Sequence, residues 1–254
     1  MILLILSVGA PLFTNKDPVA IDMTVINKAP CAEHPFGTDN YGRDVFARCL
    51  YGGRVSFKVG VLTVICTTIL GTILGLLAGY YKKIDIVIMR IIDGLTAFPA
   101  LVLGMALVAV FGQDDWNLIL ALAIVYTPGM TKIVRATVLT IRNQDYIEAA
   151  RAIGAKNRRI QFRHILPNIV SPLIVQATLV FGYAVLAEAG MSYLGLGTRP
   201  PAPSWGNILN EGKSVMLIAP WLTNLPGAFI FATVLSLNLL GDGLRDFFDP
   251  KLKK

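Results

Sequence analysis

The chain has 254 residues, of which 54% are hydrophobic and only 15% charged, and its mean hydropathy is +0.61. Soluble globular proteins carry roughly 25% charged residues, so this composition excludes an ordinary soluble domain, and it also excludes a disordered or collagen-like chain. The three cysteines and two histidines are too few for a disulfide scaffold and leave little material for a metal site, so we expect no metal centre.

Uncharged stretches long enough to cross a bilayer, which takes about 20 residues, set the expected architecture. The chain begins with a short uncharged segment, 1–15, which we interpret as a first spanning helix that is short or lacks its beginning; a signal anchor is the alternative. Longer stretches follow at residues 59–81, 94–113, 116–131, 165–187 and 214–241. The run 116–131 can extend to 138 if Lys132 and Arg135 reach the interface. The sequence therefore predicts an all-α membrane protein with about six transmembrane helices.

Between the first two spans the pattern changes to turns and a short amphipathic segment. Glycine and aspartate at 37–42 are typical turn formers, and the apolar side of 44–51 indicates a short interfacial helix before the second span. We therefore expect residues 1–57 to hold the short first helix and an extracytoplasmic segment. Residues 58–254 then form the transmembrane domain, with a long inner loop at about 139–166.

Small residues and isolated charges occur within the predicted spans. Gly71, Gly75 and Gly79 recur every four residues, which predicts a helix face that another backbone can approach closely. Arg90 and Asp93 are three residues apart and could pair on one helix. Glu188 lies near the outer end of the fifth span, and we expect both carboxylates near the interface, because a charge at the bilayer centre is costly. So few acids disfavour a proton-driven carrier.

The basic residues are distributed unequally between the two sides of the predicted bundle. Fifteen lysines and arginines lie in the segments 82–90, 132–163 and 245–254, and eight lie in the opposite set. By the positive-inside rule, the first set is cytoplasmic, and six spans then place both termini inside the cell. The net charge of +7 is thus explained by topology, and we expect no nucleic-acid partner because no basic domain with interleaved aromatics is evident.

The long inner loop reads as two short helices separated by a glycine. Ile147, Ala150 and Ile153 form a narrow apolar stripe, and Gly154 permits a left-handed turn at the helix end. An apolar pattern restarts at Ile160, and Pro167 begins the next span. Such a short helix could enter a groove on a partner protein; a helix resting on the membrane surface is the alternative.

The outer loop near residue 205 carries two features that need an interpretation. Trp205 and Trp221 flank it as interfacial anchors do. The run Gly206 to Ser214 reads G-x5-G-K-S, which is one residue too long for a phosphate-binding loop and follows no strand. We therefore expect no ATP site in this chain.

Five motifs resemble one family in order along the chain. The inner loop carries Glu148-Ala149-Ala150, three residues, Gly154, nine residues and His164-Ile165-Leu166-Pro167, and it resembles the EAA loop of ABC importer permeases. Four other stretches, at 34–44, 89–99, 192–206 and 238–250, resemble the second permease subunit of dipeptide, oligopeptide and nickel importers. The resemblance implies the type I ABC importer transmembrane fold in a bacterial inner membrane.

The resemblance also implies partners and roles. In that family the EAA loop docks on a cytoplasmic ATPase, which assigns coupling to Glu148, Ala149, Ala150, Gly154, Ala155 and Pro167. It implies a homologous second permease subunit, two ATPase subunits that carry the ATP and Mg, an extracytoplasmic substrate-binding protein, and lipid around the bundle. This chain would be a transport subunit without an ATPase site or cofactor, and would form half of a pathway for di- or oligopeptides. Import of nickel or a metal chelate is the alternative within the branch, and a non-ABC membrane carrier is a remote one.

Overall fold

The computed structural model describes residues 2–248. Met1 and residues 249–254 lie outside it, and with them the Asp249-Pro250 part of the last motif and the three C-terminal lysines used for the topology. The described part of the chain is helical, with one isolated β-bridge between Thr38 and Asp44 and no strand. The prediction of an all-α architecture is therefore confirmed.

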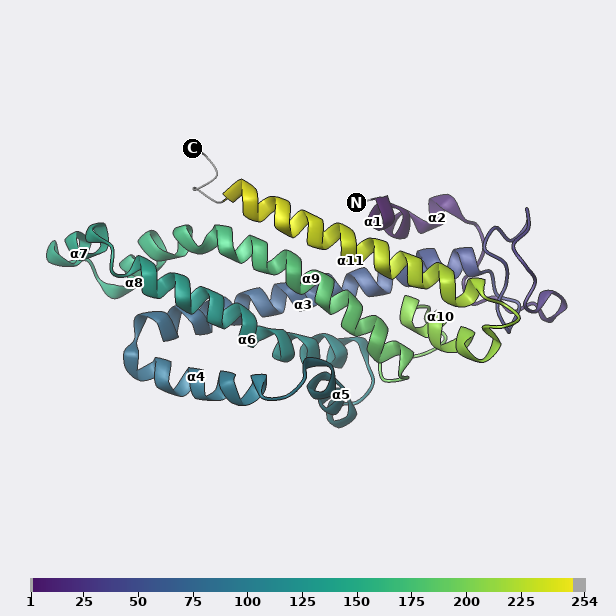
Figure 1. Cartoon of the computed structure of the whole chain (residues 1–254), viewed down its shortest axis with the longest axis horizontal. Coiled ribbons are helices and arrows are strands. Elements are labelled where there is room, and N and C mark those ends of the chain that lie inside the picture. Colours follow the sequence, from purple (N-terminus) through teal and green to yellow (C-terminus); the bar gives the residue numbers. More distant parts are fainter. Residues whose placement is uncertain (1, 249–254) are drawn as a thin grey trace. The chain divides into compact units, whose positions relative to one another are not determined.

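Most helices follow one another with short connections, whereas residues 14–44 form a long connection between α2 and α3 whose only helical element is a 3-10 turn (Figure 1). The α-helices are α1 (Ile2–Val8), α2 (Ala10–Phe13), α3 (Val45–Tyr80), α4 (Lys82–Thr96), α5 (Ala100–Phe111), α6 (Asp115–Ile141), α7 (Asp145–Ala152), α8 (Asn157–Arg159), α9 (Val170–Tyr193), α10 (Trp205–Gly212) and α11 (Trp221–Phe248). Four shorter turns complete the list: the 3-10 turns Met23–Val25, Leu166–Ile169 and Lys213–Val215, and the π-helical turn Ile160–Ile165. Residues 2–63, 104–122 and 181–237 make a first compact unit, and 64–103, 123–180 and 238–248 make a second.

Four helices in the described residues are long and apolar enough to span a membrane. They are Val45–Tyr80, Asp115–Ile141, Asn157–Tyr193 and Trp221–Phe248; the broken pair α4 and α5 makes a fifth if it is counted as one span. The predicted first span is instead the seven-residue helix α1, which at 1.5 Å per residue is only about 10 Å long and cannot cross a bilayer.

The predicted third span at 94–113 is interrupted. Helix α4 ends at Thr96, and α5 starts at Ala100 after Pro99. Proline has no N–H to donate, and it disfavours helical geometry in the residue before it, so an uncharged run that is continuous in hydropathy is divided in structure.

The predicted interfacial helix at 44–51 is the beginning of α3. Asp44 caps it, because the Asp44 carboxylate accepts a hydrogen bond from the Ala47 N–H at 2.9 Å. Gly52 and Gly53 lie inside the helix. A Cβ on Gly53 would sit 2.9 Å from the ring of Trp205, so this glycine serves close packing.

Trp205 lies in the core of the first unit, so its prediction as an interfacial anchor was wrong. The side chain is fully buried, and its indole N–H donates to the Cys49 carbonyl at 2.9 Å. The ring packs edge-on against Phe57, with 5.4 Å between the ring centroids. A buried indole needs a partner for its one polar group, and the α3 backbone supplies it.

A buried ionic network joins the loop before α3 to helix α10 in the first unit. Arg43 pairs with Asp39 at 2.7 Å and with Glu211 at 2.5 Å, and Arg48 reaches Glu211 at 2.9 Å. Both arginines are almost fully buried, so each depends on these carboxylates for compensation.

Glu188 is also fully buried in the first unit. Its two carboxylate oxygens accept hydrogen bonds from the hydroxyls of Ser56, at 2.6 Å, and Ser192, at 2.7 Å. These contacts replace water at a buried carboxylate and explain how α9 accommodates it.

In the second unit, α3 and α6 meet along the small residues. An added Cβ would lie 2.5 Å from the Met130 Cγ at Gly71, 2.5 Å from the Val134 Cβ at Gly75 and 2.6 Å from the Val138 Cβ at Gly79. Both rows recur every four residues, so glycines on one helix face larger side chains on the other. The structure thus places the three glycines where two helix backbones approach closely.

Two ion pairs connect α4 to α6 in the same unit. Arg135 donates to both carboxylate oxygens of Asp85, at 2.5 and 2.7 Å. Asp93 pairs with Lys132 at 3.0 Å, and not with Arg90, which is exposed. The expected Arg90–Asp93 pair is therefore replaced by a contact between helices.

Candidate docking site on the inner loop

Helix α7, Asp145–Ala152, lies at the end of the second unit next to α8 (Figure 1). Gln144 precedes it with extended backbone, and its carbonyl accepts the first turn's N–H from Ile147 at 2.9 Å. Asp145 and Glu148 in the first turn and Arg151 in the last complement the helix dipole. A helix of only eight residues is marginal alone, so contacts with the rest of the unit must hold it.

The turn that ends α7 has the two hydrogen bonds of a Schellman motif. The Ala155 N–H donates to the Ala150 carbonyl at 3.0 Å, and the Gly154 N–H donates to the Arg151 carbonyl at 2.9 Å. Gly154 has φ +83°, which a residue with a Cβ adopts only at a cost. The positions of the motif at 150, 154 and 155 therefore specify one turn.

One face of α7 is buried against the second unit, and the other face is exposed. Ile147 and Ala150 are buried, and Ile147 packs with Val138, Ile160 and Ile165 in the core of the second unit. Ile153, which was predicted to share this stripe, is 87% exposed. Ile153 is the C-cap residue, and six residues at 100° each place it about 120° away from Ile147, outside the buried face.

The exposed surface of α7 combines small and apolar groups. Ala149, Ala152 and Gly154 are exposed there, together with Tyr146 at 46% exposure and Ile153. A Cβ on Gly154 would meet no atom within 4 Å. Exposed apolar side chains beside small residues form the type of surface that a partner's groove can receive.

Side chains of α3 and α8, together with Arg142 just after the end of α6, hold this loop in place. The Arg151 guanidinium lies over the Tyr80 ring, 5.7 Å from its centroid, and the Tyr80 hydroxyl lies 2.8 Å from the Asn157 side-chain oxygen. Arg142 Nη1 donates to the Gly79 carbonyl at 2.8 Å. The sequence analysis missed these contacts, because they join residues 60 to 80 positions apart.

The second predicted short helix of the loop is the beginning of a long one. Helical structure runs without interruption over Asn157–Tyr193, so Pro167 lies inside it and does not start a span. Pro167 lies in the 3-10 turn Leu166–Ile169, directly after the π-helical turn Ile160–Ile165, and it removes a helical hydrogen bond there. Glu148 and Pro167 are both exposed.

The structure also bears on two other kinds of site considered in the sequence, a phosphate-binding loop and a metal centre. The run Gly206 to Ser214 lies in α10 and the following turn, where its backbone groups are engaged in helical bonding. Within residues 2–248, no group of three His, Cys, Asp or Glu side chains is arranged to hold a metal ion.

Comparison with known sequences gives matches along the whole chain. A sequence model of the family described as "Binding-protein-dependent transport system inner membrane component" matches residues 71–254. The dipeptide transport system permease protein of Alkalihalophilus pseudofirmus is 45% identical over 251 residues, which cover 98% of this chain and 83% of that protein. The glutathione transport system permease protein of Pectobacterium atrosepticum is 46% identical over 233 residues, covering 91% and 77%.

Solved structures with the same fold are also found. An inward-facing form of the MetNI methionine ABC transporter superimposes with a TM-score of 0.63 at 16% identity, covering 79% of this chain and 97% of that one. An amino acid ABC transporter crystallised with histidines gives a TM-score of 0.61 at 20% identity, covering 79% and 94%. At these identities the likeness establishes the fold alone.

Proposed function

The chain belongs to the family of inner-membrane components of binding-protein-dependent transport systems, and from this membership we propose that it is one half of the pathway of an ATP-driven importer of short peptides. It is a multi-pass membrane permease with the fold of ABC importer permeases. The other half would be a homologous second permease subunit. An extracytoplasmic binding protein would deliver the substrate.

The observation that carries the coupling part of the proposal is the arrangement of α7. The buried face of α7 is fixed in the core of the second unit through Ile147, while its exposed face presents Ala149 and Ile153. A short helix held in this way can move as a rigid body together with a partner that binds its exposed face. We infer that this partner is a cytoplasmic ATPase subunit, two of which would bind and hydrolyse ATP with Mg.

ATP hydrolysis would then take place only on the partner subunits. The helical conformation of Gly206 to Ser214 supports this part, because a phosphate-binding loop needs free backbone N–H groups. We infer that the chain itself holds no cofactor.

Peptides are the proposed substrate class, because the relatives that cover most of this chain are named as dipeptide and glutathione permeases. These names favour peptides over nickel or a metal chelate.

A crosslinking and uptake experiment tests the proposal. The complete transporter is reconstituted in proteoliposomes with its binding protein, after Cys31, Cys49 and Cys66 have been replaced. Cysteine at Ile153 should crosslink to the ATPase subunit. Cysteine at Leu194, which is also exposed but lies in the first unit, should not. Dipeptide uptake should require ATP. Absence of the Ile153 crosslink would refute the docking role, and uptake of nickel chelates without peptides would refute the substrate class.

A further inference from the structure

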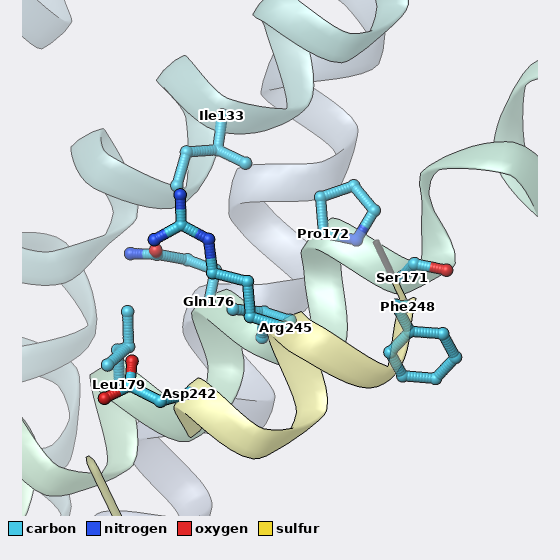
Figure 2. Close-up of a pocket in the computed structure, with 9 residues that line it drawn as sticks. Ile133, Ser171, Pro172, Gln176, Leu179, Asp242, Arg245 and Phe248 are labelled. Atoms are coloured by element: carbon cyan, nitrogen blue, oxygen red, sulfur yellow. The ribbon is translucent and has the colours of Figure 1, made fainter. Parts of the chain in front are cut away.

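The second unit contains a pocket of about 450 Å³ between α6, α9 and α11 (Figure 2). Ile133 from α6 and Leu179 from α9 give it apolar walls, and Gln176 contributes an amide. Asp242 and Arg245, both from α11, bring opposite charges to the same pocket. They belong to the motif at 238–246, for which the proposed function gives no role.

The charged groups of Asp242 and Arg245 lie in different parts of the pocket and form no ion pair with each other. Asp242 and Arg245 are three residues apart and lie on one side of α11. No ion pair joins either of them to any residue between 2 and 248. Figure 2 shows the Arg245 guanidinium extended toward Ile133 and Gln176, with the Asp242 carboxylate beside Leu179.

Both side chains are exposed and lie in the last two turns of α11, beyond the uncharged run 214–241, so neither charge needs a partner inside the protein. Their arrangement is nevertheless specific, because both line the same pocket. Arg245 in the last turn also complements the dipole of α11. That effect explains a basic residue at this position, but it does not explain a carboxylate in the same pocket.

The chemistry of the pocket fits a zwitterion. A carboxylate such as Asp242 binds an ammonium group, and the fork of an arginine binds a carboxylate through two hydrogen bonds. The amide of Gln176 can both donate to and accept from a peptide group, and the apolar walls can contact uncharged side chains. An amine at one end and a carboxylate at the other are the ends of a short unblocked peptide.

We propose that this pocket is a transient binding site for the charged ends of a short peptide, with Asp242 taking the ammonium and Arg245 the carboxylate. The inference rests on the proposed function as a peptide importer subunit. It adds a specificity site within the permease itself, at the inner end of α11. The competing explanation is that the two charges pair with charges of the second permease subunit.

The test is direct binding to the complete transporter, with both permeases and both ATPases in lipid nanodiscs, without nucleotide or binding protein. The probes are radiolabelled dialanine, its N-acetyl form and its C-terminal amide. Blocking either end should weaken binding to the natural sequence roughly tenfold, the effect of losing one charged hydrogen bond near water. Asp242→Asn should remove only the discrimination against the acetylated probe. Arg245→Gln should remove only the discrimination against the amide.

Asp246→Asn is the matched control, because Asp246 is exposed on the same helix and does not line the pocket. It should keep both discriminations. The proposal is overturned if the natural transporter binds no dialanine, or if both pocket variants discriminate as it does. A loss of thermal stability of the complex with unchanged discrimination would assign the charges to the permease interface and also overturn it.

Uptake distinguishes this inference from the proposed function. If ATP-driven dialanine uptake is normal and the binding test fails, the pocket assignment alone is wrong. If there is no peptide uptake, the proposed function is wrong, and the binding data still decide whether the pocket recognises a zwitterion.

Discussion

The Ala155 N–H donates to the Ala150 carbonyl across 3.0 Å and closes the turn that separates α7 from α8. This bond requires Gly154 to adopt φ +83°, and it brings Ala155 back against the core of the second unit. The turn therefore fixes both where α7 ends and which of its faces is free.

Substitution of Gly154 should weaken the turn through the backbone alone. Gly154→Ala places its Cβ in open space, so the expected loss of about 1–2 kcal/mol comes from the left-handed conformation. We expect ATP hydrolysis to continue while peptide uptake falls, measured as the ratio of the two rates in proteoliposomes. Gly94→Ala is the control, because Gly94 also has free space but lies within a helix. Equal ratios in the two variants would contradict the role of the turn.

Ala149 and Ala150 should respond differently to the same change. Ala150→Glu puts a carboxylate where the side chain is buried, which should destabilise the second unit by about 2 kcal/mol or more. Ala149→Glu changes only the exposed face, so it should reduce ATPase binding with little effect on thermal stability. Thermal denaturation in detergent and co-purification of the ATPase measure the two effects. Similar melting temperatures for the two variants would contradict the assignment of faces.

Because α3 and α6 are in close contact at Gly75, we expect that even one added methyl group at this position destabilises the protein. Gly75→Ala brings its Cβ to 2.5 Å from the Val134 Cβ, and the helices must separate to accommodate it, at a cost of about 1–3 kcal/mol. Gly227→Ala, where nothing lies within 4 Å, should leave the melting temperature nearly unchanged. The comparison is made by thermal denaturation of purified protein. A neutral Gly75→Ala would exclude close backbone contact at this position.

The two ion pairs between α4 and α6 should differ in strength. Asp85→Asn removes the charge that two Arg135 nitrogens contact and should cost about 1–3 kcal/mol. Asp93→Asn breaks a single contact to Lys132 between more exposed groups and should cost less than about 1 kcal/mol. Denaturation of the two variants at low and high salt gives the ranking. A larger effect at Asp93 would contradict it.

The apolar runs predicted most of the spanning helices, because hydropathy is a local property. Their interruptions and extensions depended on other information. Pro99 separates α4 from α5 within one apolar run. Asp44 caps α3, so this helix begins well before its apolar run. Trp205 is buried, and its indole N–H donates to the Cys49 carbonyl. Such outcomes depend on neighbours distant in sequence, which hydropathy does not report.

The candidate site was located by its motif, but its geometry was not predictable from the sequence. The glycine at 154 correctly indicated a left-handed turn. The orientation of Ile153 depended on helical phase and on the turn that follows it, and the contact between Arg151 and Tyr80 depended on the packing of α3. The pocket at Asp242 had no sequence signal, because opposite charges three residues apart ordinarily indicate a pair.

The continuous helix Asn157–Tyr193 begins directly after the turn at Gly154. At 1.5 Å per residue its 37 residues make a rod about 55 Å long, more than the thickness of the hydrocarbon layer. If a partner tilts this helix at its Asn157 end, as the proposed docking on α7 requires, a small rotation there would produce a larger displacement at the Tyr193 end.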